Sequence, residues 1–192
     1  MDIGKFLIKK KGYGNRNISG STDVGKIRDN NEDYFLVLQD KNLYIVSDGM
    51  GGQNGGEVAS FNASKSIEKY FTPERLETIK GNNELIKKAL IYSIQYAHKV
   101  VLNLQQENQN FKGMGCTIIV AYIEKNNLHL CHVGDTRGYV LNKSGLELLT
   151  RDHSQVMELV KQGKMTLEEA KNSNMKNQLR QAIGAPMHIV PD

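Results

Sequence analysis

The chain has 192 residues, of which 39% are hydrophobic and 24% charged, and its formal net charge is +4. This length fits one domain with a sizeable core, and no apolar run approaches the ~20 residues of a membrane span. The two cysteines, Cys116 and Cys131, form no disulfide framework and favour a reducing compartment, so we expect a cytoplasmic protein that binds neither membranes nor nucleic acid.

Residues 1–17 are basic, with Asp2 as the single acidic residue among them. A solvated tail explains such a run more simply than a surface for an anionic partner does. We expect residues 1–17 to form an extension of low order, and residues 18–192 to form the folded domain.

Apolar runs over residues 34–38 and 43–46, separated by a polar turn, predict a β-hairpin whose second strand leads into a glycine cluster. A helix is expected from Gly55 to Thr72-Pro73. A second helix is expected over residues 83–106, with Tyr92 and Tyr96 widening its apolar stripe.

Four short strands follow, over residues 117–122, 128–133, 138–141 and 146–149, and their short turns demand antiparallel neighbours. Beyond Thr150 the pattern becomes helical and polar, with a break at Gly163 and a capping signal at Thr166. This order of strands and helices predicts an α+β fold rather than a parallel βαβ array.

Four aspartates stand where predicted strands end: Asp23, Asp33, Asp48 and Asp135. A single strand-end aspartate is usually a turn residue. Several carboxylates that converge repel one another unless a cation lies among them, and Mg²⁺ or Mn²⁺ prefers such oxygen ligands. The group therefore suggests a divalent metal site.

Other sites are less well supported by the sequence. Gly49-Met50-Gly51 begins like a dinucleotide-binding loop, but Asn54 stands where that loop needs glycine. His129 and Cys131 would lie on one face of a strand and His132 on the other, so structural roles are favoured over a zinc site.

Three segments in chain order resemble the type 2C family of metal-dependent protein phosphatases. They cover residues 22–33, then 46–52 with 56–60, then 115–117 with 133–137. A weaker fourth segment covers residues 149–154, 177–179 and 182–184. Met50, where other branches have histidine, resembles the bacterial branch.

The resemblance implies two antiparallel β-sheets packed as a sandwich and flanked by helices (α-β-β-α), with metals at one end. Carried over residue by residue, Asp33 and Asp48 are metal ligands, and the Gly49 carbonyl is a further one. Arg28 holds the substrate phosphate, and Asp135 binds a third, weaker ion.

The resemblance also implies that Glu32 supports the site indirectly and that residues 151–180 form a mobile flap. His153 either orients that flap or serves as a cap or surface residue. The implied activity is hydrolysis of phosphoserine and phosphothreonine in proteins by water activated between two Mn²⁺ or Mg²⁺ ions, with substrates made by a serine/threonine kinase.

The family continues past this pattern with another Ser-Asp-Gly segment and a late Asp-Asn pair, both bearing metal ligands. Since the sequence printed here stops at Asp192, we expect a C-terminally incomplete domain with impaired activity. Two alternatives stay open: a non-catalytic phosphoprotein-binding or regulatory module, and a phosphatase of small phosphate esters.

Overall fold

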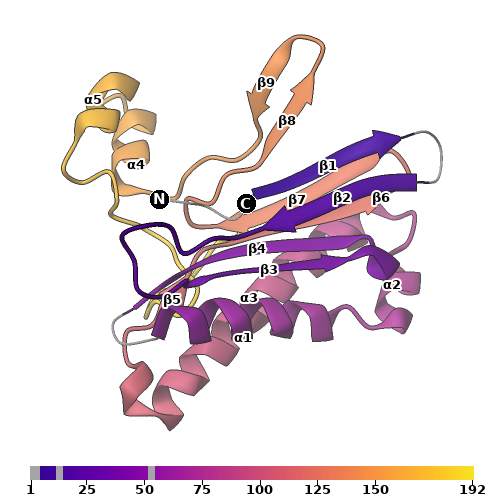
Figure 1. Cartoon of the computed structure of the whole chain (residues 1–192), viewed down its shortest axis with the longest axis horizontal. Helices are drawn as coiled ribbons and strands as arrows, with labels where there is room; N and C mark the ends of the chain where they lie inside the picture. Colours follow the sequence, from indigo (N-terminus) through magenta and orange to yellow (C-terminus); the bar gives the residue numbers. More distant parts are fainter. Residues whose placement is uncertain (1–4, 12–14, 52–54) are drawn as a thin grey trace.

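The main sheet of the molecule has five antiparallel strands, in the order β3-β4-β6-β7 with the short β5 paired to β4 (Figure 1). The structure is a computed structural model and describes residues 5–11, 15–51 and 55–192. The strands are β3 (Asp33–Leu38), β4 (Leu43–Met50), β5 (Gly115–Cys116), β6 (Ile118–Glu124) and β7 (Asn127–Val133). The antiparallel pairing confirms the predicted α+β class.

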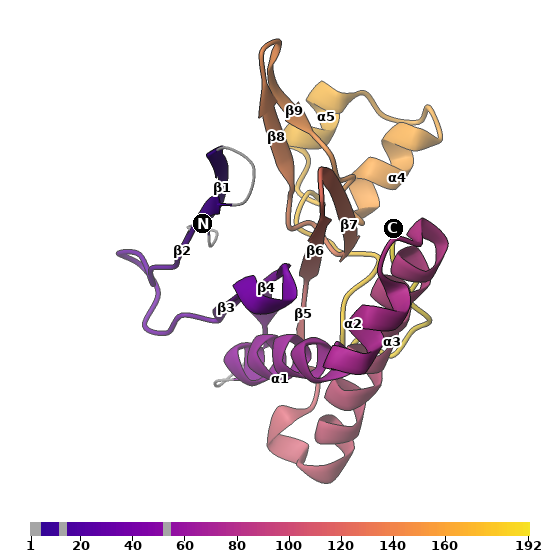
Figure 2. The same cartoon turned by 90° about the vertical axis from the view of Figure 1, so that its right-hand side faces the viewer.

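Three helices cover one face of this sheet (Figure 2). They are α1 (Gly55–Tyr70), α2 (Pro73–Ile79) and α3 (Asn83–Glu107). No helix in the described ranges is long and apolar enough to cross a membrane.

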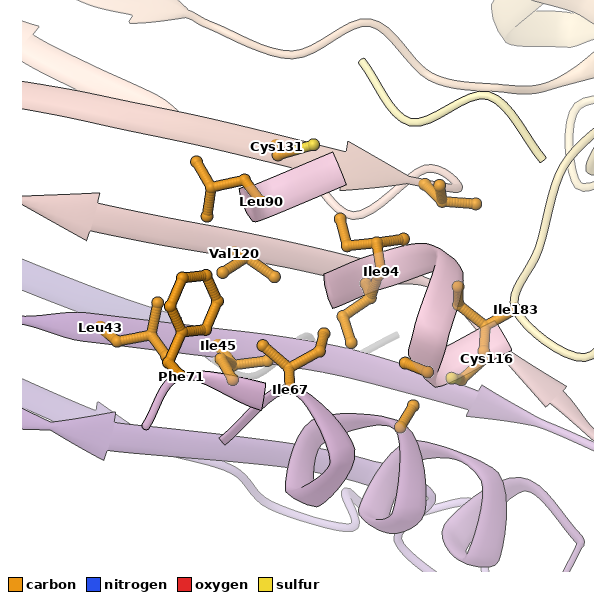
Figure 3. Packing of buried hydrophobic residues seen from close by; sticks show 14 of the residues in the cluster. Leu43, Ile45, Ile67, Phe71, Leu90, Ile94, Cys116, Val120, Cys131 and Ile183 are labelled. Atoms are coloured by element: carbon orange, nitrogen blue, oxygen red, sulfur yellow. The ribbon is translucent and has the colours of Figure 1, made fainter. Parts of the chain in front are cut away.

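The hydrophobic core lies between the sheet and these helices (Figure 3). Leu43 and Ile45 point from β4 toward the helices, because alternate residues of a strand share a face. Both cysteines are free and buried in this core. The apolar stripe of α3 is confirmed, but Tyr92 and Tyr96 are about half exposed and do not widen it as expected.

The helix α2 was not predicted. Pro73 indicated only the end of the preceding helix, whereas it stands at the first turn of α2, where its missing N–H costs nothing. The Thr72 side chain accepts a hydrogen bond from the Arg75 N–H and caps this helix. The same residues therefore end one helix and begin the next.

Two separate two-stranded ribbons lie on the side of the main sheet away from α1 and α3, as both views show (Figures 1 and 2). One pairs β1 (Lys5–Lys11) with β2 (Asn15–Ser21), and the other pairs β8 (Tyr139–Asn142) with β9 (Gly145–Leu148). The expectation of low order for residues 1–17 is therefore wrong for residues 5–11 and 15–17, which pair along their backbones, and residues 1–4 and 12–14 lie outside the described residues.

Residues 151–180 contain two short helices, α4 (Gln155–Lys161) and α5 (Leu167–Asn172). Thr166 and Glu169 form the predicted capping box at the start of α5. Gly163 has φ +69° between the two helices, which confirms the predicted break. Whether this segment moves as a flap stays a prediction.

Candidate active site

Asp33 and Asp48 lie directly opposite each other in the register of β3 and β4. Residues opposite each other in an antiparallel pair point to the same face of the sheet, with Cβ atoms about 4.5–5.5 Å apart. Both aspartates are partly buried. The register thus brings together the two carboxylates that the sequence singled out.

Gly49 allows β4 to pass very close to the start of α1. Its N–H donates to the Glu32 carbonyl over 3.0 Å. A Cβ atom on Gly49 would lie 2.2 Å from the Gly56 carbonyl oxygen and 2.5 Å from that of Glu32. A side chain is therefore excluded at position 49. The neighbouring Gly52 of the sequence motif lies outside the described residues.

The Glu32 side chain holds the beginning of α1. Its carboxylate accepts a hydrogen bond from the Gly56 N–H. The Ser60 hydroxyl donates to the Glu32 carbonyl over 2.7 Å. Burial raises the pKa of Glu32 above its ordinary value, and this hydrogen bond and the Arg28 charge both oppose that rise. These contacts suit a residue that positions the backbone beside Asp33.

Thr117 and Thr136 form a buried link that the sequence analysis did not find. The Thr117 hydroxyl lies against the Thr136 hydroxyl and accepts from the Asp48 N–H over 3.3 Å. The Thr117 N–H also donates to the Asp48 carbonyl over 2.8 Å. Both threonines fall inside the motifs of the family resemblance. Their contacts with each other and with the Asp48 backbone become visible only when the neighbouring strands are placed in register.

The electrostatics of Asp48 reflect crowding by other acids. Burial contributes most to raising its pKa to about 6, and the charges of Asp33, Asp135 and Glu32 add to the rise. The Arg28 charge opposes it. The four other residues are therefore within electrostatic reach of Asp48 at this end of the sheet.

Asp135 lies in the loop between β7 and β8. Burial is the main cause that raises its pKa, and the Asp152 charge adds to it while Arg137 opposes it. Arg137 makes a bidentate ion pair with Asp152, at 2.9 and 2.6 Å. His153 is buried, so it is not the surface residue that was one of its two expected roles.

Arg28 and Asp23 lie in the loop between β2 and β3. Arg28 is exposed and lowers the pKa of both Glu32 and Asp48, so its guanidinium lies near the acidic group. The Asp23 carboxylate accepts from the Gly25 N–H over 2.7 Å and makes a local turn. Of the four strand-end aspartates, Asp23 is thus explained by its turn.

The chemistry of this group fits a divalent cation. Within the described ranges no three His, Cys, Asp or Glu side chains lie close enough together to hold an ion. However, Mg²⁺ commonly binds through one or two carboxylates and keeps several waters. Asp33 and Asp48 supply that pair, and the Arg28 charge only partly offsets the rise in the pKa of Asp48 that burial and the neighbouring acids cause.

A cavity of about 310 Å³ borders the end of β4. Met50 lines it together with other apolar residues, among them Met114, Leu179 and Met187. The side chain at position 50 is therefore apolar and carries no proton that could be transferred.

The chain is similar in sequence to proteins of known family. A model described as Protein phosphatase 2C matches residues 15–158. The serine/threonine phosphatase stp of Listeria welshimeri is 36% identical over 181 residues, covering 89% of this chain and 68% of that protein.

Solved structures give the same result. The Streptococcus agalactiae serine/threonine phosphatase superposes with a TM-score of 0.79 at 32% identity, covering 98% of this chain and 72% of its own. The catalytic domain of the phosphatase PstP, solved with two manganese ions, has a TM-score of 0.72 over 100% of this chain and 72% of its own. At 24% identity, this second structure shows a shared fold.

Proposed function

Because the chain belongs to the protein phosphatase 2C family, a family of serine/threonine phosphatases, we propose that it hydrolyses phosphoserine and phosphothreonine in proteins with the help of Mn²⁺ or Mg²⁺. The observation that carries this proposal is the opposition of Asp33 and Asp48 at the end of a rigid sheet. Two neighbouring carboxylates repel each other when no cation is bound, and they bind a divalent cation well when one is present.

Asp33 and Asp48 would hold the metal, together with the Gly49 carbonyl, and Asp135 would hold a further, weaker ion. Bound there, divalent ions supply a water of lowered pKa and neutralise charge on the phosphoryl oxygens. The chain's own contribution is to keep the two carboxylates in register and to hold the backbone of residue 49 in place through Glu32.

Arg28 would bind the substrate phosphate. Its guanidinium is exposed beside the acids, and a guanidinium binds phosphate through two parallel hydrogen bonds. Met50 lacks a titratable proton, and we propose that water protonates the leaving serine or threonine oxygen. A general acid at position 50 is thus excluded by chemistry.

We further propose that residues 18–192 form the catalytic domain with a flap over residues 151–180. The substrates would be phosphoproteins made by a serine/threonine kinase, in the cytoplasm. The alternatives are a non-catalytic phosphoprotein-binding module and a phosphatase of small phosphate esters. The binding module would bind phosphoproteins without hydrolysing them, and the other alternative would hydrolyse small esters rather than phosphoproteins.

One experiment separates the three. The 192-residue chain is mixed with Mn²⁺ and either a phosphothreonine peptide or p-nitrophenyl phosphate, and phosphate release and peptide binding are both measured. Metal-dependent release from the peptide supports the proposal. Peptide binding without release, in a chain that binds Mn²⁺, favours the binding module over the impaired enzyme expected from the sequence, and release from the small ester alone favours the third alternative.

A further inference from the structure

The loop that carries Asp135 is held by two consecutive residues, Asp152 and His153. Gly134, just before Asp135, exchanges two hydrogen bonds with His153. The His153 N–H donates to the Gly134 carbonyl over 2.9 Å, and the Gly134 N–H donates to His153 Nδ1 over 3.3 Å. Both backbone polar groups of Gly134, its N–H and its carbonyl, are therefore bound by one residue.

The backbone at Gly134 needs such support. It has φ +107°, and a Cβ atom there would lie 2.5 Å from Thr117 Cβ. Glycine has the widest conformational freedom of all residues. The backbone conformation of a loop at a glycine is therefore determined by its hydrogen-bond partners. The direction of the next residue, Asp135, depends on this peptide.

The His153 ring is itself fixed on its other sides. Since Nδ1 accepts from Gly134, the ring proton is on Nε2, which donates to Asp192 Oδ2 over 3.2 Å. The ring stacks on His132, with ring centroids 4.6 Å apart. Two backbone hydrogen bonds between Asp192 and His132, of 2.9 and 3.1 Å, tie that arrangement to β7.

The loop on the C-terminal side of Asp135 is held by Asp152, the residue before His153. Asp152 pairs in bidentate geometry with Arg137, two residues after Asp135. The His153 carbonyl also accepts from the Arg180 N–H over 2.8 Å, and Ser154 forms a β-bridge with Leu179. The beginning and the end of segment 151–180 thus contact each other at His153 and Ser154, beside the Asp135 loop.

We propose that His153 is a positioning residue, which fixes the Gly134 peptide through Nδ1 and thereby aims the Asp135 carboxylate at the candidate metal site. This inference rests on the proposed metal site. Residues 153–154 and 179–180, where the two ends of segment 151–180 contact each other, then move together with the Asp135 loop. A shift of these residues therefore changes the direction of the Asp135 side chain. Loss of a group that orients a metal ligand typically weakens metal binding about 10–100-fold.

The test uses two variants that each keep one half of the imidazole. In His153→Asn the amide oxygen takes the place of Nδ1 and still accepts from Gly134. In His153→Gln the amide reaches the place of Nε2 and leaves the Gly134 N–H without an acceptor. Hydrogen exchange of the Gly134 amide is followed by NMR in the metal-free chain, and Mn²⁺ binding is measured by calorimetry.

We expect His153→Gln to lose protection at Gly134 and to bind the weaker Mn²⁺ ion, the one proposed at Asp135, about tenfold more weakly, whereas His153→Asn keeps both properties near wild type. Protection at Gly134 that persists in His153→Gln would overturn the proposal. So would equal losses of protection in the two variants, because these indicate a general loss of structure.

Asp192 provides a second pair if changes at the buried ring prevent folding. Asp192→Asn keeps the oxygen that accepts from Nε2, while Asp192→Ala releases the ring. Faster exchange at Gly134 only in Asp192→Ala supports the proposal, and no difference between the pair contradicts it. A wild-type chain that binds no Mn²⁺ would instead contradict the proposed function, and the exchange measurement would still decide the role of His153.

Discussion

Asp33 of β3 faces Asp48 of β4 across the sheet, so two carboxyl groups occupy one cross-strand pair. Like charges directly opposite each other destabilise a sheet. Here burial and neighbouring acids raise the pKa of Asp48 to about 6. The pair therefore weakens the metal-free protein and prepares it to bind a cation.

Replacement of Asp48 by asparagine tests the metal site. A ligand that binds only the folded state stabilises it by about 2.7 kcal/mol at a hundredfold excess over its Kd. We expect Mn²⁺ to raise the melting temperature of the wild-type chain and to leave that of Asp48→Asn unchanged, as measured by circular dichroism. Asp40→Asn is the control, because Asp40 is exposed at the opposite end of β3. An equal Mn²⁺ response in wild type and Asp48→Asn would rule Asp48 out as a ligand.

The stability of the metal-free chain should fall as pH rises from about 4 to above 6. The folded Asp48 keeps its proton up to a pKa of about 6, whereas the unfolded carboxyl loses it near the ordinary aspartate pKa of 3.8. Between these values the folded state binds more protons, so raising the pH favours unfolding. The full shift corresponds to about 3 kcal/mol, and partial exposure reduces this to about 1–2 kcal/mol.

Urea unfolding at pH 4 and pH 8 in the presence of EDTA measures this effect. Asp48→Asn lacks the titrating group, so the difference between its stability and that of wild type should grow with pH in favour of the variant. A constant difference across this range would show that Asp48 titrates normally.

Periodicity and turns predicted most of the main sheet, because the hairpin turn at residues 39–42 determines its register. Once Leu38 pairs with Leu43, every pair toward the far end follows, including Asp33 with Asp48. The β1–β2 ribbon was missed because it pairs residues that are mostly basic or polar. Composition carries no information about that pairing.

The roles of the site residues came from a family resemblance rather than from spacing. Spacing indicated only that Asp33, Asp48 and Asp135 stand at strand ends. The links from Thr117 to Thr136 and from His153 to Gly134 each join positions 19 residues apart through a side chain. Such links depend on how separate elements pack, which no local pattern encodes.

Replacement of Gly49 by alanine tests the close approach of β4 and α1. The added Cβ would meet two carbonyl oxygens at 2.2 and 2.5 Å, both on backbone that cannot rotate away. We expect a loss of about 3 kcal/mol in the free energy of unfolding, measured in urea. Gly81→Ala is the comparison, since its Cβ meets nothing within 4 Å and only its φ of +73° costs about 1 kcal/mol. Similar losses in both variants would mean that the contact relaxes easily.

Replacement of Arg28 by lysine tests its proposed contact with the substrate phosphate. Lysine keeps the positive charge but cannot form two parallel hydrogen bonds, each of which contributes about 1.5–3 kcal/mol when a charged group is involved. We expect kcat/KM for a phosphothreonine peptide with Mn²⁺ to fall about 10–100-fold, while the Mn²⁺ affinity stays near that of wild type. Lys26→Ala is the matched control, because Lys26 is an exposed cation in the same loop. If Lys26→Ala lowers kcat/KM as much as Arg28→Lys does, the loop attracts the phosphate by charge alone and Arg28 has no specific role.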